Sequence, residues 1–185
     1  RPVETVEAEN AYTIADGIAV KKVGAITFPI IQKYVDDVVS VSESAIADAI
    51  LILLERKKLV VEGAGAVTVA AAIEGKLRTK PKKAVFILSG GNIDVTTLDR
   101  ILRLGLLKEG RVIRISTIVP DRPGALAALT SIIAACRANI LHVVHERDAV
   151  DVPVGSTKLD IILEVEGSEH AERLTKTLRE KGYGV

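Results

Sequence analysis

The stretch AVFILSGGNID, residues 84–94, is the part of the sequence from which we interpret the fold. Its four consecutive apolar residues, 85–88, are typical of a short strand that is buried on both faces. We expect the strand to end at Ser89, where two glycines let the backbone turn sharply and approach a ligand closely. Asp94 or Thr96 should then cap a helix. A strand, a glycine turn and a helix often form a ligand site in α/β sheets, although the pattern also suits a turn that only connects two elements.

The composition limits the class of protein. A length of 185 residues predicts one or two domains. The formal net charge is +1 and no basic block occurs, which argues against nucleic acid or an anionic membrane as a partner. The longest apolar run, residues 45–54, is interrupted by Asp48 and is too short to span a bilayer, and no signal-peptide pattern is present. One cysteine, Cys136, excludes an internal disulfide and fits a reducing compartment, so we expect a cytoplasmic protein.

The apolar residues of the chain are mostly aliphatic, with few aromatic ones. Hydrophobic residues make up 48% of the chain, but aromatic residues only 3%, so the excess is aliphatic. We expect a partner subunit to cover part of this surface. The sequence has no Met and starts at Arg1, which we interpret as the mark of a fragment or a trimmed product.

The N-terminal half predicts alternating extended segments and helices. Residues 35–41 should form a strand, and Ser42 should cap a helix over 43–57, whose apolar residues recur at helical spacing. A second helix is expected over 66–74. Glu62 stands between an apolar segment and a glycine turn, where it is a candidate site residue, although the helix dipole also favours a glutamate at a helix N-terminus.

The C-terminal half has a different pattern, and we place a domain boundary between residues 107 and 108. Residues 112–119 alternate as a strand does, and further strands and helices follow in a βαββα order, with a last strand starting near Tyr183. This order predicts a ferredoxin-like sheet with two helices on one face. Cys136 lies on the apolar stripe of a helix, which favours a buried, unreactive thiol. His142 and His145 should face opposite ways, which argues against a shared metal site.

Three motifs occur in an order and spacing that resemble the later part of the catalytic domain of the threonine ammonia-lyase (threonine dehydratase) family. They are TIADGIAV at 13–20, KLVVEGAGA at 58–66 and LSGGNID at 88–94. The segment DRPGAL at 121–126 resembles the ACT regulatory domain attached to many of these enzymes. The resemblance implies an α/β protein. Residues 1–107 would be part of a tryptophan-synthase-β-like (PLP fold type II) catalytic domain, followed over 108–185 by a ferredoxin-like βαββαβ ACT regulatory domain.

The resemblance also implies chemistry. Members of this family use pyridoxal 5'-phosphate as an electron sink and convert L-threonine to 2-oxobutanoate and ammonia, or serine to pyruvate. By position, Ser89 would hydrogen-bond the pyridine nitrogen of the cofactor. Glu62 would lie near the ring, and Gly17 and Gly90 would pack against it.

The sequence departs from the family in two ways that matter. The stretch Ser-x-Lys-x-Arg-Gly, which carries the Schiff-base lysine, and the glycine-rich phosphate loop do not occur here. We therefore assign no catalytic residue and expect the chain alone to be inactive. Glu7, Glu9 and Asn10 could offer oxygen atoms to a hard cation, or simply form a solvated loop. Related racemases and lyases bind a divalent cation at a site that would include Glu7. Because Thr13 stands at the position of its second carboxylate, we predict no metal.

A second hypothesis is an amino-acid-sensing module, since ACT-like domains commonly pair and bind an amino acid at their interface. The turn before the first helix would offer backbone N–H groups to a carboxylate, and the start of the next strand could line a neighbouring domain's pocket. The candidate effector-binding residues are Asp121, Gly124, Ala125 and Leu126 in the turn, and Asn139 and Ile140 in the strand. Isoleucine or valine is the first effector to test, and a homo-oligomer, dimer or tetramer, is expected. A third hypothesis is a structural pairing domain that only holds subunits together.

Overall fold

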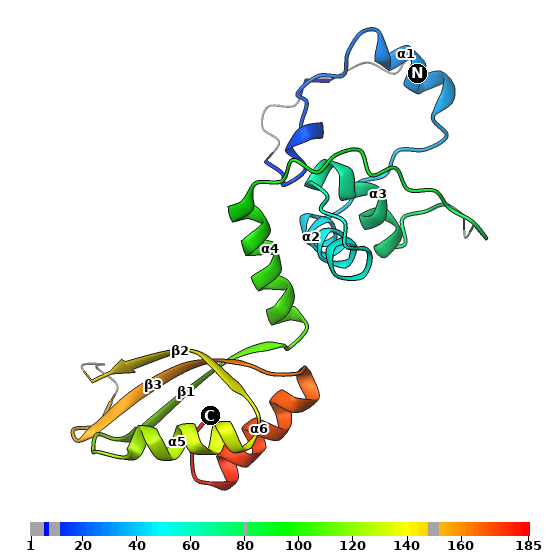
Figure 1. The fold of residues 1–185 in the computed structure, drawn as a ribbon. Coiled ribbons are helices and arrows are strands. Elements are labelled where there is room, and N and C mark those ends of the chain that lie inside the picture. The colour runs from blue at the N-terminus through cyan, green and yellow to red at the C-terminus, as the bar shows by residue number, and fades with distance from the viewer. Residues whose placement is uncertain (1–5, 8–11, 80, 148–151) are drawn as a thin grey trace. The chain divides into compact units, whose positions relative to one another are not determined.

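The computed structural model describes residues 6–7, 12–79, 81–147 and 152–185. The chain divides into two compact units, Arg1–Leu102 and Arg103–Val185 (Figure 1). This division falls within a helix, and the domain boundary placed between residues 107 and 108 stays a prediction.

The N-terminal unit is helical wherever its described residues have regular structure. Its elements are η1 (Asp16–Ile18), α1 (Thr27–Tyr34), α2 (Glu43–Ile52), the π-helical turn η2 (Leu53–Lys57), α3 (Gly63–Ile73) and the first part of α4 (Val95–Lys108). The core forms where α2 and α3 pack together, with Ala49, Ile50, Ala66 and Ala70 almost fully buried. Alanine at this contact lets the two helices approach closely, so that a unit poor in large side chains still packs well.

Capping side chains fix where the helices of this unit begin. The Ser42 hydroxyl accepts a hydrogen bond from the Ala45 N–H at 3.1 Å, as the sequence predicts. The same hydroxyl donates to Glu74 at 2.5 Å, and this hydrogen bond is the main cause that lowers the pKa of the Glu74 carboxyl. Asp94 accepts the Thr97 N–H at 2.9 Å, so Asp94, rather than Thr96, caps α4.

Two predicted strands of this unit are wrong. Neither residues 35–41 nor 85–88 form a strand, and no described residue of the unit does. Val85 is 91% exposed, so residues 85–88 are not buried on both faces. Val38, in the segment 35–41, is 78% exposed. A strand requires a hydrogen-bonded neighbour, and the described residues of this unit supply none. The second helix was also placed too late, because α3 begins at Gly63, before residue 66.

The C-terminal unit contains a three-stranded antiparallel sheet in the order β1-β3-β2. Its elements are β1 (Val112–Pro120), α5 (Ala125–Ala135), β2 (Asn139–Glu146), β3 (Ser156–Glu164) and α6 (Ser168–Glu180). Figure 1 shows α5 and α6 on one face of the sheet, which confirms the predicted ferredoxin-like arrangement. The last strand of the predicted βαββαβ order is absent from residues 181–185. Tyr183 and Val185 instead pack against the core as irregular chain.

The core of this unit lies between the sheet and its two helices. It is made by aliphatic side chains from every element, including Ile115, Leu129, Leu159, Ile161 and Leu174. On the other face of the sheet, Asp160 is buried, and the Arg114 guanidinium lies 3.1 Å from its carboxylate. Burial raises the pKa of Asp160, but hydrogen bonds from Ser116 and Arg114 and the charges of Arg114 and Lys158 outweigh burial, so the pKa lies below its usual value.

His170 is a buried histidine with both ring nitrogens hydrogen-bonded. The Glu166 N–H lies 3.2 Å from Nδ1, and the Cys136 carbonyl oxygen lies 2.8 Å from Nε2. Nδ1 therefore accepts a hydrogen bond while Nε2–H donates one, which is the pattern of a neutral imidazole. His170 ties the end of α5 to the start of α6 and has no nitrogen left for a ligand.

Replacing Thr117 with valine is expected to raise the free energy of unfolding by about 1 kcal/mol. Thr117 is 2% exposed, and its hydroxyl finds no hydrogen-bond partner in the described part of the chain. An unpaired buried hydroxyl costs free energy that a methyl group of similar size does not. Chemical denaturation checks this, with Thr130→Val as the control, because the Thr130 hydroxyl donates to the Ala127 carbonyl at 3.1 Å. A Thr117→Val variant less stable than the parent would contradict the expectation.

Candidate functional site

Glu62 links two of the sequence motifs in the N-terminal unit. It is the residue before α3, and its backbone N–H donates to the Gly90 carbonyl oxygen at 3.1 Å. Its side chain accepts the Asn92 N–H at 3.0 Å. Main chain and side chain of Glu62 thus hold both ends of the glycine turn. The link involving Asn92 was not predicted, because a backbone N–H carries no sequence signal.

Two glycines make room for the Glu62 carboxylate. A Cβ added at Gly90 would lie 2.8 Å from Glu62 Cδ, and nearer still to Oε1. A Cβ added at Gly17 would lie 3.5 Å from Oε1 and 3.1 Å from the Ala64 Cβ. Gly17 and Gly90, which lie far apart in the sequence, therefore both lie against the Glu62 carboxylate. A side chain at Gly90 would overlap the carboxylate as the atoms stand, and one at Gly17 would be tight against Ala64.

Ser89 precedes this turn and is exposed, so its hydroxyl is accessible to a ligand. Further glycines bring the surrounding backbones together. A Cβ at Gly65 would meet the Gly90 carbonyl oxygen at 2.9 Å, and one at Gly91 would meet the Val60 carbonyl oxygen at 2.8 Å. The apolar segment before Glu62 and the glycine turn are therefore in direct backbone contact, which is the arrangement expected if both belong to one site.

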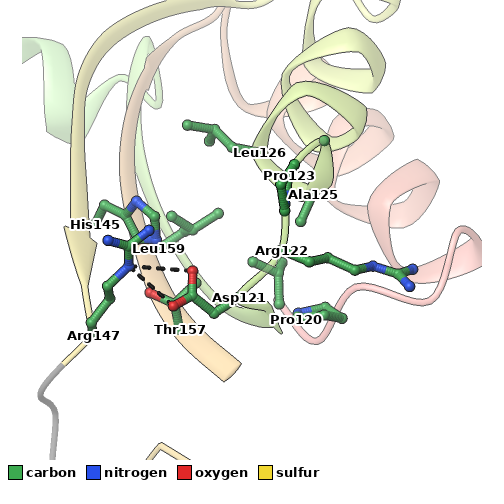
Figure 2. Close-up of a pocket in the computed structure, with 12 residues that line it drawn as sticks. Pro120, Asp121, Arg122, Pro123, Ala125, Leu126, His145, Arg147, Thr157 and Leu159 are labelled. Carbon is green, nitrogen blue, oxygen red and sulfur yellow. Dashed lines mark hydrogen bonds and ion pairs between the residues drawn. The ribbon is translucent and has the colours of Figure 1, made fainter. Parts of the chain in front are cut away.

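A second candidate site lies entirely in the C-terminal unit. It is a cavity of about 540 Å³ beside the turn between β1 and α5 (Figure 2). Gly124 has a φ of +89° and is the residue before α5, so the turn opens onto the helix N-terminus. Four predicted effector-binding residues line the cavity: Asp121, Gly124, Ala125 and Leu126.

The other two predicted residues do not reach this cavity. Asn139 and Ile140 pair with Glu164 and Leu163, at the far end of β3 from the cavity. Their assignment to a neighbouring domain's pocket stays a prediction. Polar residues that the sequence analysis missed line the cavity instead, namely His145, Arg147 and Thr157. The antiparallel pairing brings them there, since His145 stands opposite Leu159 across the β2–β3 ladder.

Each half of the chain matches a known protein family. Residues 1–90 match the family model described as pyridoxal-phosphate dependent enzyme, and residues 113–182 match the ACT domain model. The chain joins part of a domain of the pyridoxal-phosphate-dependent enzyme family to an ACT domain. The fold class expected from the sequence is thereby confirmed.

Relatives of known identity match nearly the whole chain. It is 52% identical over 177 residues to L-threonine ammonia-lyase of Thermotoga maritima, which covers 96% of this chain and 44% of that protein. It is 46% identical over 180 residues to L-threonine ammonia-lyase of Geobacter sulfurreducens, with coverages of 97% and 45%. The crystal structure of a threonine deaminase from T.th. is 40% identical, covers 48% of this chain and 32% of that chain, and has a TM-score of 0.46. The chain spans less than half the length of the two ammonia-lyases.

The described ranges lack both a membrane-spanning helix and a cluster of metal-binding side chains. None of their helices has the length and apolar character that crossing a bilayer requires. Within the same ranges, no three or more His, Cys, Asp or Glu side chains are grouped so that they could hold a metal ion.

Proposed function

We propose that this chain is part of a pyridoxal-phosphate-dependent threonine/serine ammonia-lyase, which converts L-threonine to 2-oxobutanoate and ammonia. The convergence of Gly17, Glu62 and Gly90, inside the segment that matches the pyridoxal-phosphate-dependent family, carries the proposal. The two relatives named L-threonine ammonia-lyase support the choice of reaction. We place the protein in the cytoplasm and expect a homo-oligomer.

The residues present fit the cofactor. A flat ring packs best on a surface without projecting side chains, and Gly17 and Gly90 present bare backbone next to Glu62. The exposed Ser89 hydroxyl would donate a hydrogen bond to the pyridine nitrogen. Bound pyridoxal phosphate supplies an electron sink for the charge left when the α-proton departs. A hydroxyl does not hold the ring nitrogen protonated as a carboxylate does, so delocalisation is limited, which favours loss of the β-hydroxyl over transamination.

Glu62 would act by holding the turn that presents Ser89. Its two backbone-directed hydrogen bonds, to Gly90 and from Asn92, fix the residues that follow the hydroxyl. The Schiff-base lysine motif is absent from this sequence, so the chain alone is expected to lack turnover.

The ACT domain would bind an amino-acid effector, with isoleucine or valine as the first to test. The alternative function is an amino-acid sensor and pairing module without catalysis. It is supported by the C-terminal unit, which has a core of its own and a cavity beside the β1–α5 turn. The two functions are separated by whether the full-length protein turns over threonine.

The full-length protein that contains this chain should release 2-oxobutanoate from L-threonine in the presence of pyridoxal phosphate. The 185-residue chain alone should show no turnover above that of the free cofactor, because it lacks the lysine. In the full-length protein, Ser89→Ala should lower kcat by about tenfold, the worth of one hydrogen bond of about 1.4 kcal/mol. Ser40→Ala removes another exposed hydroxyl, from a segment without regular secondary structure, and should leave kcat unchanged.

The outcomes separate the hypotheses. A full-length protein inactive on both threonine and serine would favour the sensor without catalysis. Turnover by the 185-residue chain would contradict the assignment of the lysine to another part of the protein.

A further inference from the structure

Two opposite charges are in direct contact in the lining of the cavity of the C-terminal unit. Asp121 belongs to the turn after β1, and Arg147 directly follows β2. Arg147 Nε lies 3.2 Å from Asp121 Oδ1 and 3.1 Å from Oδ2 (Figure 2). The Nε–H group donates a hydrogen bond to Oδ1, and the other guanidinium N–H groups of Arg147 have no acceptor among the described residues, so they can serve a ligand.

This ion pair is easy to open. The Arg147 side chain is 64% exposed and that of Asp121 is 32% exposed, and ion pairs so accessible to water add little to stability. The Asp121 backbone is held independently, because its N–H donates to the Gly155 carbonyl oxygen at 2.9 Å. The carboxylate can thus change partner while the turn keeps its place.

Beyond this ion pair, the cavity lining includes both polar side chains, such as His145 and Thr157, and aliphatic ones. Leu126 and Leu159 supply aliphatic surface, and Gly124 leaves the turn's backbone open, since a Cβ there would meet nothing within 4 Å. The paired charges of Arg147 and Asp121, next to aliphatic surface in a cavity of about 540 Å³, are complementary to an α-amino acid with an aliphatic side chain.

We propose that the Asp121–Arg147 ion pair is the ligand-free arrangement of an amino-acid pocket, and that the ligand takes the place of each partner. Arg147 binds the α-carboxylate of the ligand, and Asp121 binds its α-ammonium group. Each charge exchanges one ionic partner for another, so no charge is left unpaired on binding. This inference rests on the proposed function, because it presupposes that an amino acid enters this cavity. It adds Arg147, which the motif-based assignment did not contain, as a specificity-determining residue.

The chain offers a matched control in Arg122. This residue lies on the same turn and also lines the cavity, yet Figure 2 shows its guanidinium directed away from Asp121 and Arg147. Arg122→Gln and Arg147→Gln therefore each remove one positive charge from the cavity lining, but only Arg147→Gln also removes the ion pair with Asp121.

Calorimetry on the 185-residue chain tests the proposal with L-valine and L-isoleucine as probes. L-Valinamide lacks the carboxylate and 3-methylbutanoate lacks the ammonium group. The parent chain should bind L-valine about 10- to 100-fold more tightly than either analogue, the range for one charge-assisted contact. Arg147→Gln should abolish the preference over L-valinamide, and Asp121→Asn the preference over 3-methylbutanoate. Arg122→Gln should keep both preferences.

The possible failures are distinguishable. Unchanged preferences in Arg147→Gln and Asp121→Asn would overturn this inference while leaving amino-acid binding intact. Absence of heat with both L-valine and L-isoleucine in the parent chain would overturn effector binding itself, and the inference with it. Should either variant fail to fold, the Nε–H resonance of Arg147 in the parent decides. It should shift on addition of L-valine but not of L-valinamide, and an unmoved resonance would overturn the proposal.

Discussion

Replacing Gly63 with alanine is expected to lower the free energy of unfolding of the N-terminal unit by about 3 kcal/mol, at the upper end of the cost of overpacking. A Cβ at this position would lie 2.5 Å from the Ile14 carbonyl carbon and 2.9 Å from the Ala15 nitrogen, with the Ile14 oxygen nearer still. All three are backbone atoms, which cannot rotate away as a side chain does. Ile14 is also held in place, because its N–H donates to Glu43 at 2.8 Å.

Native-state hydrogen exchange reads this unit separately from the other, through the amides of α2 and α3. Their protection should fall in the Gly63→Ala variant. Gly184→Ala adds the same atoms where nothing lies within 4 Å and should leave protection unchanged. Equal protection in the two variants would mean that the α3 N-terminus can move away from Ile14 at little cost.

Replacing Leu174 with alanine is the other large effect that we expect, a loss of about 2–5 kcal/mol from the stability of the C-terminal unit. Leu174 lies on α6 with 0% exposure, in the core between helices and sheet. Removing most of its side chain there sacrifices burial and leaves a cavity that the surrounding side chains fill only in part.

The matched control is Leu141→Ala, since Leu141 belongs to β2 and is 51% exposed. Exchange of the β3 amides should accelerate strongly in Leu174→Ala and only slightly in Leu141→Ala. Comparable acceleration in both would show that the core does not depend on α6 as the structure implies.

Local signals predicted the helices well, whereas strand formation depended on partners distant in sequence. Ser42 marks the start of α2 because a capping hydroxyl acts within three residues. Residues 85–88 have the composition of a buried strand, but composition does not supply a neighbour for the backbone hydrogen bonds. In the C-terminal unit such neighbours exist, and the alternation of residues 112–119 correctly predicted β1.

The same distinction applies to the two sites. Gly17, Glu62 and Gly90 were chosen because the motifs that contain them resemble a known family, and the structure brings all three together. Arg147 belongs to no motif. It reaches the cavity only because β2 runs antiparallel to β3 and ends beside the β1–α5 turn. Pairing of this kind joins residues whose separation in the sequence gives no indication of contact.

The hydrogen bonding of His170 has a consequence for chemical labelling. The chain has three histidines, of which His142 and His145 are exposed while His170 is buried with both nitrogens occupied. An acylating reagent such as diethyl pyrocarbonate should therefore modify two imidazoles in the native protein. The third would react only once the junction between α5 and α6 has come apart, which makes its modification a simple reporter of unfolding in that unit.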